Sequence, residues 1–139
     1  MMPCKTSFVT IGDLIFVAAR IEGRRTSRIV SLVIDTGAAL TTITPSVAYD
    51  LGYTADHALR KTRVTTAMGV EHGYTIEVER LSVLGLGIAQ FEMNVFDLGH
   101  RDLAGLLGMN FLALLNFEVR SAEHRIVAEP ATRPSPAWL

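Results

Sequence analysis

Asp35 is the residue whose type and position point most directly to chemistry. It follows the mostly apolar run IVSLVI (residues 29–34) and begins the tripeptide Asp-Thr-Gly. A buried carboxylate costs free energy unless it is paired or hydrogen-bonded, and no Lys or Arg lies between residues 30 and 60. A carboxylate held at the end of a core strand can act as a general acid or base. Such chemistry commonly uses two carboxyl groups, whereas Asp-Thr-Gly occurs once in this chain.

The same tripeptide is also a good structural turn. An Asp side chain accepts hydrogen bonds from nearby backbone N–H groups, and Gly adopts a positive φ at little cost. On the tripeptide alone, a turn without catalytic function explains residues 35–37 as well as a catalytic carboxylate does. The surrounding strands and any further motifs must therefore decide between the two.

The composition excludes several classes of function. The chain has 139 residues, 49% of them hydrophobic, which is enough for one domain with its own core. Thirteen basic and fourteen acidic residues nearly cancel, whereas a general nucleic-acid or membrane-surface binder needs a basic excess. No stretch reaches the roughly 20 apolar residues of a membrane-spanning helix, and the start does not resemble a signal peptide. We expect a cytoplasmic protein that binds neither nucleic acid nor membrane.

Metal ions and cofactors are not expected. Cys4 is the only cysteine, so neither an intrachain disulfide nor a cysteine-based zinc site can form. The four histidines, at positions 57, 72, 100 and 124, lack the spacing of known metal motifs.

The remaining pattern predicts a mostly β fold. Runs rich in Val, Ile, Phe and Thr, separated by Gly-containing turns, predict many short strands. One helix is expected over residues 44–52, capped by Thr44, begun by Pro45 and ended by Gly52. The predicted strands cover residues 8–12, 14–21, 28–34, 39–44, 88–96, 117–120 and 125–128, with a long hairpin over 62–83 and a strand from 106 that becomes a helix after Asn110. We predict a closed barrel or sandwich over residues 1–128, with one or two short helices. Residues 129–139, which hold three of the five prolines, are expected to form a flexible tail.

Three segments in this order resemble single-domain retropepsin-like aspartic proteases of the viral and bacterial type. LVIDTGAALTTITPSVAYDLGY (residues 32–53) is similar to their active-site segment, and VTTAMGVEHGYTIEVERLSVLG (64–85) is similar to their flap hairpin. GLLGMNFL (105–112) is similar to their apolar-apolar-Gly motif with the short helix that follows. Met109 departs from the viral pattern, which usually has Arg there, so a dimer interface would differ in detail. The resemblance implies an aspartic endopeptidase.

The resemblance also implies a homodimer. Two-lobed relatives carry two Asp-Thr-Gly motifs in one chain, and here a two-fold axis would supply the second carboxylate. Two adjoining carboxyl groups share one proton and titrate as a pair, and the aspartic protease dyad is itself the best-known example of such a pair. One Asp35 would activate water while the protonated Asp35 of the second copy polarises the scissile carbonyl.

Further site residues follow from the resemblance one at a time. Thr36 would hydrogen-bond across the dimer axis, and Gly37 would let the backbone approach the dyad. Ala38 would contact substrate and stands where pepsin-like members often have Ser, whose hydroxyl would donate to the carboxylate. Because Ala38 lacks that donor, we predict a pH optimum less acidic than that of pepsin.

The flap and the strand beside Asp35 would complete the substrate site. Ala67, Met68, Gly69 and Val70 would form the flap tip over an extended peptide, with Gly69 as the flexible position. Leu106 and Leu107 would line the floor. Glu71 and His72, just beyond the tip, could bias charge preference, although a solvated pair is the simpler expectation.

Two other interpretations stay open. The chain could be a catalytically silent dimerisation or peptide-binding module that keeps the protease fold. It could also be a β-rich scaffold with an incidental turn at Asp35. The intact tripeptide favours an active enzyme, because a silent module has no need of the carboxylate.

Overall fold

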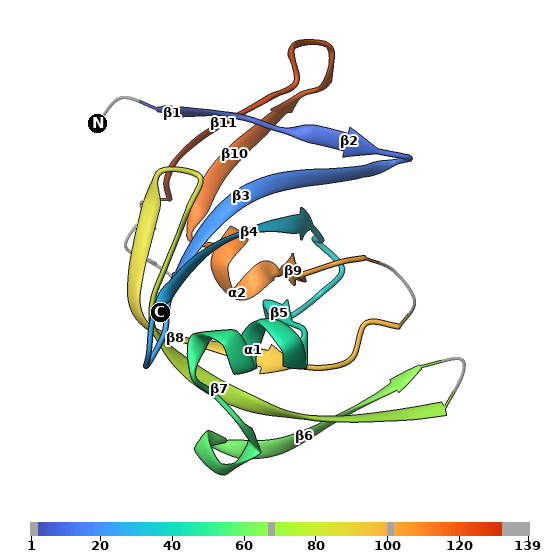
Figure 1. The fold of residues 1–139 in the computed structure, drawn as a ribbon. Coiled ribbons are helices and arrows are strands. Elements are labelled where there is room, and N and C mark those ends of the chain that lie inside the picture. The colour runs from blue at the N-terminus through green and yellow to red at the C-terminus, as the bar shows by residue number, and fades with distance from the viewer. Residues whose placement is uncertain (1–2, 67–68, 100–101, 132–139) are drawn as a thin grey trace, which may run out of the picture.

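The computed structural model describes residues 3–66, 69–99 and 102–131, and a closed β-barrel is its main feature (Figure 1). The strands of this sheet are β2 (Val9–Ile11), β3 (Leu14–Glu22), β4 (Ser27–Ile34), β5 (Thr42–Ile43), β6 (Arg60–Thr66), β7 (Gly69–Val83), β8 (Leu86–Val95) and β9 (Gly105–Leu107). The order β3-β4-β9-β5-β8-β7 becomes a ring because β3 pairs a second time, with β7. β2 and β6 extend the sheet beyond β3 and β7. The predicted mostly β, closed barrel is confirmed.

Strand β7 must bend to close this ring. Its buried residues change face along the strand, from Ile76 and Val78 to Leu81 and Val83. The change falls where the pairing of β7 with β8 is interrupted between Val78 and Arg80. Gln90, on β8 opposite this interruption, has a positive φ of 51°. Such local distortions bend a strand and re-aim its side chains. Beyond the bend, β7 runs beside β3.

A second, three-stranded sheet lies at the top of Figure 1. It contains β1 (Cys4–Ser7), β11 (Arg125–Pro130) and β10 (Leu115–Arg120), all antiparallel and in the order β1-β11-β10. β10 and β11 agree with the predicted strands, but β1 was not predicted. Its sequence CKTS has no apolar alternation, and its backbone bonds come from β11, more than a hundred residues away. β11 continues two residues past the predicted domain end, and residues 132–139 lie outside the described residues.

The helices are α1 (Pro45–Leu51), α2 (Met109–Leu112) and the 3-10 turns η1 (Ala55–His57) and η2 (Ser121–Glu123). α1 agrees with its predicted caps, since the Thr44 side chain accepts the Val47 N–H and Gly52 has a φ of 103°. α2 begins at Met109, so the prediction that it starts after Asn110 is wrong. The extended Gly108 already ends β9, and the helix follows at once.

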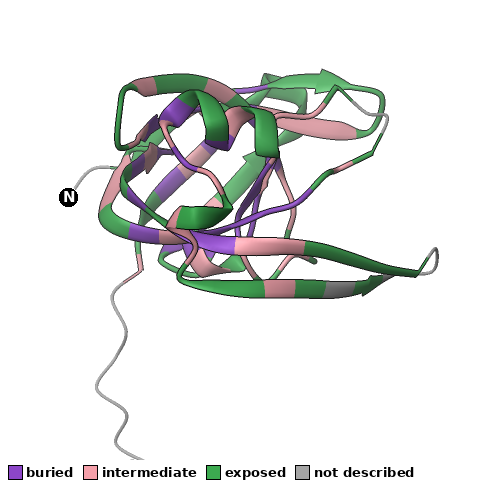
Figure 2. Cartoon of the chain, turned by 60° about the horizontal axis from the view of Figure 1, so that its bottom comes forward, coloured by how far each residue is buried: buried purple, intermediate pink, exposed green. Residues whose placement is uncertain are grey.

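The β6–β7 hairpin extends away from the body of the barrel, as predicted for a flap (Figures 1 and 2). Figure 2 shows buried residues concentrated in the body and exposed residues toward the end of the hairpin. Predicted tip residues Ala67 and Met68 lie outside the described residues. The core is formed mainly by apolar side chains on the inner faces of the strands and helices, among them Val17, Ile21, Leu32, Ile43, Leu51, Ile76, Met93, Leu107, Phe111 and Ile126.

Candidate active site

Asp35 is held at the end of β4 by the neighbouring parallel strand β9. Ile34 is in register with Leu107, and the Asp35 N–H donates to the Leu107 carbonyl at 3.0 Å. The half-buried Asp35 side chain accepts the Gly37 N–H through Oδ1 at 2.9 Å, and its carbonyl accepts the Ala38 N–H at 3.2 Å. Oδ2 has no hydrogen bond to any residue that the structure describes. The turn and the presented carboxylate therefore occur together, and neither interpretation of the tripeptide excludes the other.

Gly37 and Thr36 lie on the exposed side of this turn. A Cβ atom at Gly37 would lie 3.3 Å from the Asp35 Oδ1, so a side chain there would crowd the carboxylate. Thr36 is exposed, and its hydroxyl makes no hydrogen bond within the described part of the chain. Both predicted residues thus flank Asp35 at the surface.

The segment after Asp35 is anchored to the start of α2. The N–H groups of Met109 and Asn110 donate to the carbonyls of Ala38 and Ala39, at 2.8 and 2.9 Å. These bonds satisfy backbone donors of the first helical turn and fix the path of the chain beside the carboxylate.

A polar network around Asn110 supports the same segment from inside. Its Oδ1 accepts both the backbone N–H and the hydroxyl of Thr41, each at 2.8 Å, and its Nδ2 donates to the Glu92 carbonyl at 2.9 Å. The Thr41 hydroxyl oxygen in turn accepts the Gly108 N–H at 3.1 Å. Sequence reasoning missed Thr41 and Asn110 as supporting residues. The available signal was a polar Thr and Asn within otherwise apolar motifs.

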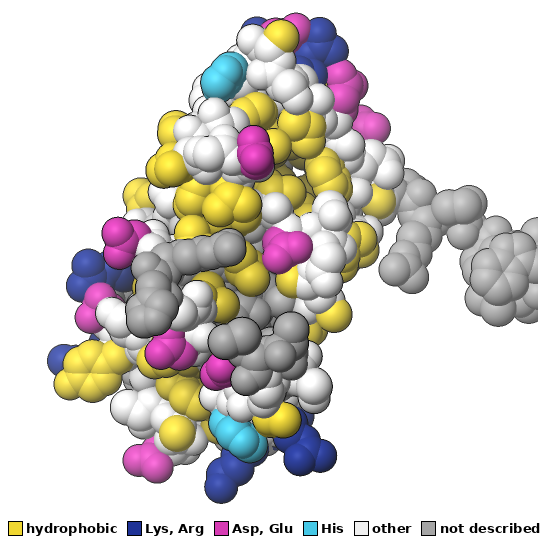
Figure 3. Space-filling model, turned by 90° about the vertical axis from the view of Figure 1, so that its right-hand side faces the viewer, with side chains coloured by type: hydrophobic (Ala, Val, Ile, Leu, Met, Phe, Trp, Pro, Cys, Tyr) yellow, Lys and Arg dark blue, Asp and Glu magenta, His cyan; other side chains and the backbone are white. Residues whose placement is uncertain are grey.

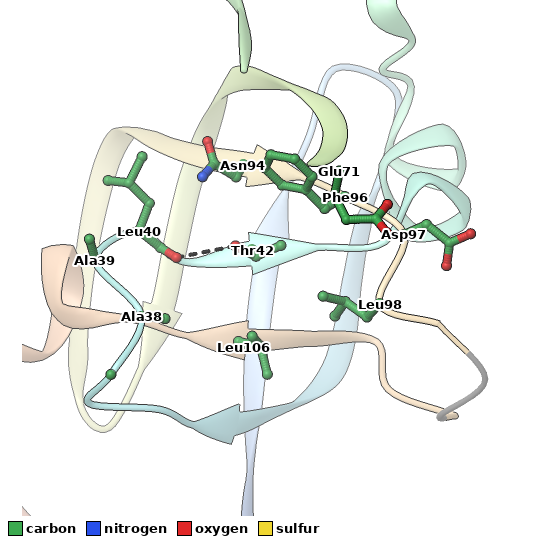
Figure 4. Close-up of a pocket in the computed structure, with 11 residues that line it drawn as sticks. Ala38, Ala39, Leu40, Thr42, Glu71, Asn94, Phe96, Asp97, Leu98 and Leu106 are labelled. Carbon is green, nitrogen blue, oxygen red and sulfur yellow. Dashed lines mark hydrogen bonds between the residues drawn. The ribbon is translucent and has the colours of Figure 1, made fainter. Parts of the chain in front are cut away.

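A cavity of about 430 Å³ opens next to this segment (Figure 4). Ala38 and Leu106, both predicted substrate contacts, line it, and so does Gly37. Leu107, the other predicted contact on β9, is fully buried in the core and does not line the cavity. Its contribution to the site is the carbonyl that accepts the Asp35 N–H. The remaining lining residues, which sequence reasoning did not assign to the pocket, are Ala39, Leu40, Thr42, Glu71, Asn94, Phe96, Asp97 and Leu98.

Of the described flap residues, Glu71 on β7 lines this cavity. Gly69 and Val70 are exposed at the start of β7 and do not line it. Figure 3 shows the face toward which the hairpin extends: hydrophobic side chains gather at its middle with acidic side chains among them, and Lys and Arg lie toward its edges.

An ion pair connects the base of the flap with β8. Arg60 on β6 donates to Glu92 Oε2 at 2.7 Å. This hydrogen bond, together with the charge of Arg60, holds the pKa of the Glu92 carboxyl below its ordinary value. The backbone carbonyl of Glu92 is the one that Asn110 binds, so both contacts meet at one point of β8.

The described residues contain no group of three or more His, Cys, Asp or Glu side chains that could hold a metal ion. Among them there is also no helix with the length and apolar character needed to cross a membrane.

A family model described as aspartyl protease matches residues 17–111. This span runs from β3 through the Asp35 turn and the flap into α2. The chain belongs to the aspartyl protease family. No curated protein matches this aspartyl protease in sequence.

Solved structures show which fold this aspartyl protease has. A retropepsin-like aspartic protease from Rickettsia conorii matches with a TM-score of 0.69 and 19% identity, covering 91% of this chain and 98% of that one. The protease of EIAV, in complex with the inhibitor HBY-793, matches with a TM-score of 0.54 and 22% identity over 76% and 92% of the two chains. The retroviral protease-like domain of Ddi1 from Leishmania major matches with a TM-score of 0.58 and 16% identity, covering 84% of this chain and 94% of that one. The predicted retropepsin-like fold is confirmed.

Proposed function

We propose that this protein is an aspartic endopeptidase that works as a homodimer. The observation that carries the proposal is the environment of the Asp35 carboxylate. Its carboxylate is half-buried, one oxygen is fixed by the Gly37 N–H, and the other has no hydrogen bond to a described residue. The apolar cavity begins two residues further along the chain. Membership of the aspartyl protease family supports the same chemistry.

The homodimer follows from the number of carboxylates. One chain supplies one Asp-Thr-Gly and therefore half of a dyad. A two-fold axis beside Asp35 would bring a second Asp35 into contact and make the interface self-complementary. The exposed Thr36, whose hydroxyl has no hydrogen bond within the described residues, is available to bond across that axis.

The proposed reaction needs no covalent intermediate. The ionised carboxylate takes a proton from water as the water oxygen attacks the scissile carbonyl carbon, while the protonated carboxyl donates its proton to the carbonyl oxygen. A tetrahedral diol results. When the C–N bond breaks, the leaving nitrogen takes a proton from the carboxyl group, and one diol hydroxyl gives its proton to the other carboxylate as the carbonyl re-forms, which restores the shared-proton dyad. Gly37 keeps space at the carboxylate, since a Cβ atom would lie 3.3 Å from Oδ1.

The substrate would bind in an extended form between the flaps and the dyad. Ala38 and Leu106 would contact its side chains from the barrel. Ala67, Met68, Gly69 and Val70 would close over it and exclude water. Leu107 would act through its backbone, as the acceptor beneath Asp35.

A mixed peptide library, incubated from about pH 4 to 7 with and without pepstatin, tests the proposal. Cleavage by the wild type is expected to vanish in Asp35→Asn and to persist in Asp13→Asn, a control at an exposed position in the turn between β2 and β3. Sedimentation should show a dimer. No cleavage at any pH by a protein shown to be dimeric would favour the silent peptide-binding module instead. A rate profile that peaks near pH 2–3, as roughly expected for a pepsin-type dyad, would contradict the predicted effect of Ala38.

A further inference from the structure

We propose that the cavity beside Asp35 selects a basic side chain, Lys or Arg, of the peptide substrate. The inference rests on the proposed function, because it assigns a substrate class to the same site. Glu71 and Asp97 would be the residues that determine this preference.

The cavity suits the stem of a long side chain. Leu40, Phe96, Leu98 and Leu106 line it with apolar groups, and its volume of about 430 Å³ exceeds that of one side chain. The methylene stems of Lys and Arg pack against apolar surface while the charged head reaches a polar region. A purely apolar lining would favour Leu or Phe equally well, so the polar groups of the cavity decide the preference.

Two acidic residues from different parts of the chain belong to this lining. Glu71 belongs to the flap strand β7, and Asp97 follows the end of β8. Asp97 Oδ1 accepts the Gly99 N–H at 2.9 Å, which fixes the side chain, and neither carboxylate forms an ion pair with a described residue. In Figure 4 both side chains lie on the side of the pocket nearest Leu98, away from Leu40. The cavity therefore offers two negative charges without a described countercharge.

Two nearly buried polar side chains complete the lining. Thr42 is 7% exposed and its hydroxyl donates to the Leu40 carbonyl at 3.2 Å (Figure 4), so its oxygen has lone pairs left to accept with. Asn94 is 8% exposed; its Oδ1 accepts the Thr75 hydroxyl at 2.9 Å, and its Nδ2 has no acceptor among the described residues. Acceptors thus outnumber donors in the cavity. A Lys or Arg side chain carries only donors, and a peptide carbonyl can satisfy the single amide donor of Asn94.

Because Glu71 lies on the flap strand, its contribution to this preference depends on the flap lying over the bound peptide. When the flap lies over a bound peptide, Glu71 on the flap and Asp97 on the loop after β8 would face the same substrate side chain. An acidic substrate side chain would face two like charges and be rejected, whereas a neutral one would be tolerated. Because a symmetric dimer has two such cavities, the preference should occur at two positions, one on each side of the scissile bond.

The test compares peptides that carry Lys, norleucine or Glu at each position in turn around a cleaved bond. Norleucine keeps the stem of Lys and lacks the charge. At two positions we expect kcat/KM for Lys to exceed that for norleucine by about four- to 25-fold, since each of the two partly exposed charge pairs contributes roughly two- to five-fold and the two factors multiply. Glu71→Gln and Asp97→Asn should each lower this ratio about two- to five-fold, and the double variant should abolish it. Glu77→Gln, an exposed carboxylate on the same strand that does not line the cavity, should leave the ratio unchanged.

Binding of the same peptides to Asp35→Asn, followed by fluorescence anisotropy, measures the ratio without hydrolysis. Cleavage with no preference for Lys, or a preference that survives the double variant, would overturn this inference and leave the proposed function intact. If no peptide is cleaved, the proposed function fails, and equal affinities for Lys and norleucine peptides in the binding measurement would then overturn the inference as well. A Lys preference in binding that falls on adding Glu71→Gln and is lost when Asp97→Asn is added as well would sustain it.

Discussion

Replacement of Asn110 by Ala is expected to destabilise the protein strongly, although the Asn110 side chain hydrogen-bonds Thr41 and Glu92 and not Asp35. The variant loses three hydrogen bonds: two that Oδ1 accepts from Thr41 at 2.8 Å and one that Nδ2 donates to the Glu92 carbonyl at 2.9 Å. Thr41 is fully buried, so its backbone N–H is left without an acceptor from the protein.

The size of the effect follows from these contacts. A buried donor or acceptor left without its partner costs about 1–3 kcal/mol. Asn110 is only half-buried, so a water molecule can enter the space of the lost amide and recover part of this cost. We therefore expect a loss of about 3 kcal/mol in the free energy of unfolding. This is less than the roughly 5–15 kcal/mol by which domains of this kind are stable, so the variant should still fold.

Urea unfolding at one fixed protein concentration measures the loss, because the stability of a dimer depends on concentration. Asn116→Ala is the matched control, since Asn116 is exposed on β10. Thr41→Val, combined with Asn110→Ala in a double-mutant cycle, should give a coupling energy of about 1 kcal/mol, because the two side chains share a bond. A loss in Asn110→Ala no greater than in Asn116→Ala, or strict additivity in the cycle, would refute the role given to the network.

Three further changes test other parts of the structure. Gly108→Ala places a Cβ atom 2.7 Å from the Leu40 carbonyl carbon; since this neighbour is backbone, we expect a loss of about 2–3 kcal/mol in urea unfolding, and wild-type stability would count against the close approach. Thr36→Val should weaken the proposed dimer in sedimentation while the monomer keeps its far-UV circular dichroism; an unchanged dimer dissociation constant would argue against Thr36 at the axis. Arg60 lowers the Glu92 pKa in the folded state, so the pair stabilises the fold above the ordinary carboxyl pKa of 4.5, and this contribution is lost as the pH falls through the lowered folded-state value. Glu92→Gln should therefore reduce the acid dependence of stability, and an unaltered pH profile would contradict this.

Local signals made part of the fold predictable. Helix α1 is specified by neighbours in sequence: Thr44 caps it, Pro45 begins it and Gly52 ends it in a left-handed conformation. The position of Asp35 at the end of a strand was equally predictable, because an apolar strand ends where a charged residue and a turn begin. These features depend on residues within a few positions of each other.

The features that could not be predicted depend on contacts between distant segments. The barrel closes because residues 20–22 pair with 80–82. Strand β1 forms because it pairs with the edge of β11. Leu106 and Leu107 illustrate the limit within a single strand. Neighbouring residues of a strand face opposite sides, so one lines the cavity and the other enters the core. Two adjacent leucines carry no signal that tells which is which.

Rate and selectivity should respond differently to mutation in this site, because different contacts fix them. The segment that runs from Asp35 to Leu40 both presents the carboxylate and forms one wall of the cavity. Its anchor is the start of α2, through the bonds of Ala38 and Ala39. Damage to that anchor displaces the reacting group and the wall together, so turnover and side-chain preference should change at once. Glu71 and Asp97 line the cavity from β7 and from the loop after β8, outside this segment. Their replacement should alter the choice between Lys and norleucine while leaving the support of Asp35 intact, and this separation distinguishes a residue that selects the substrate from one that positions the dyad.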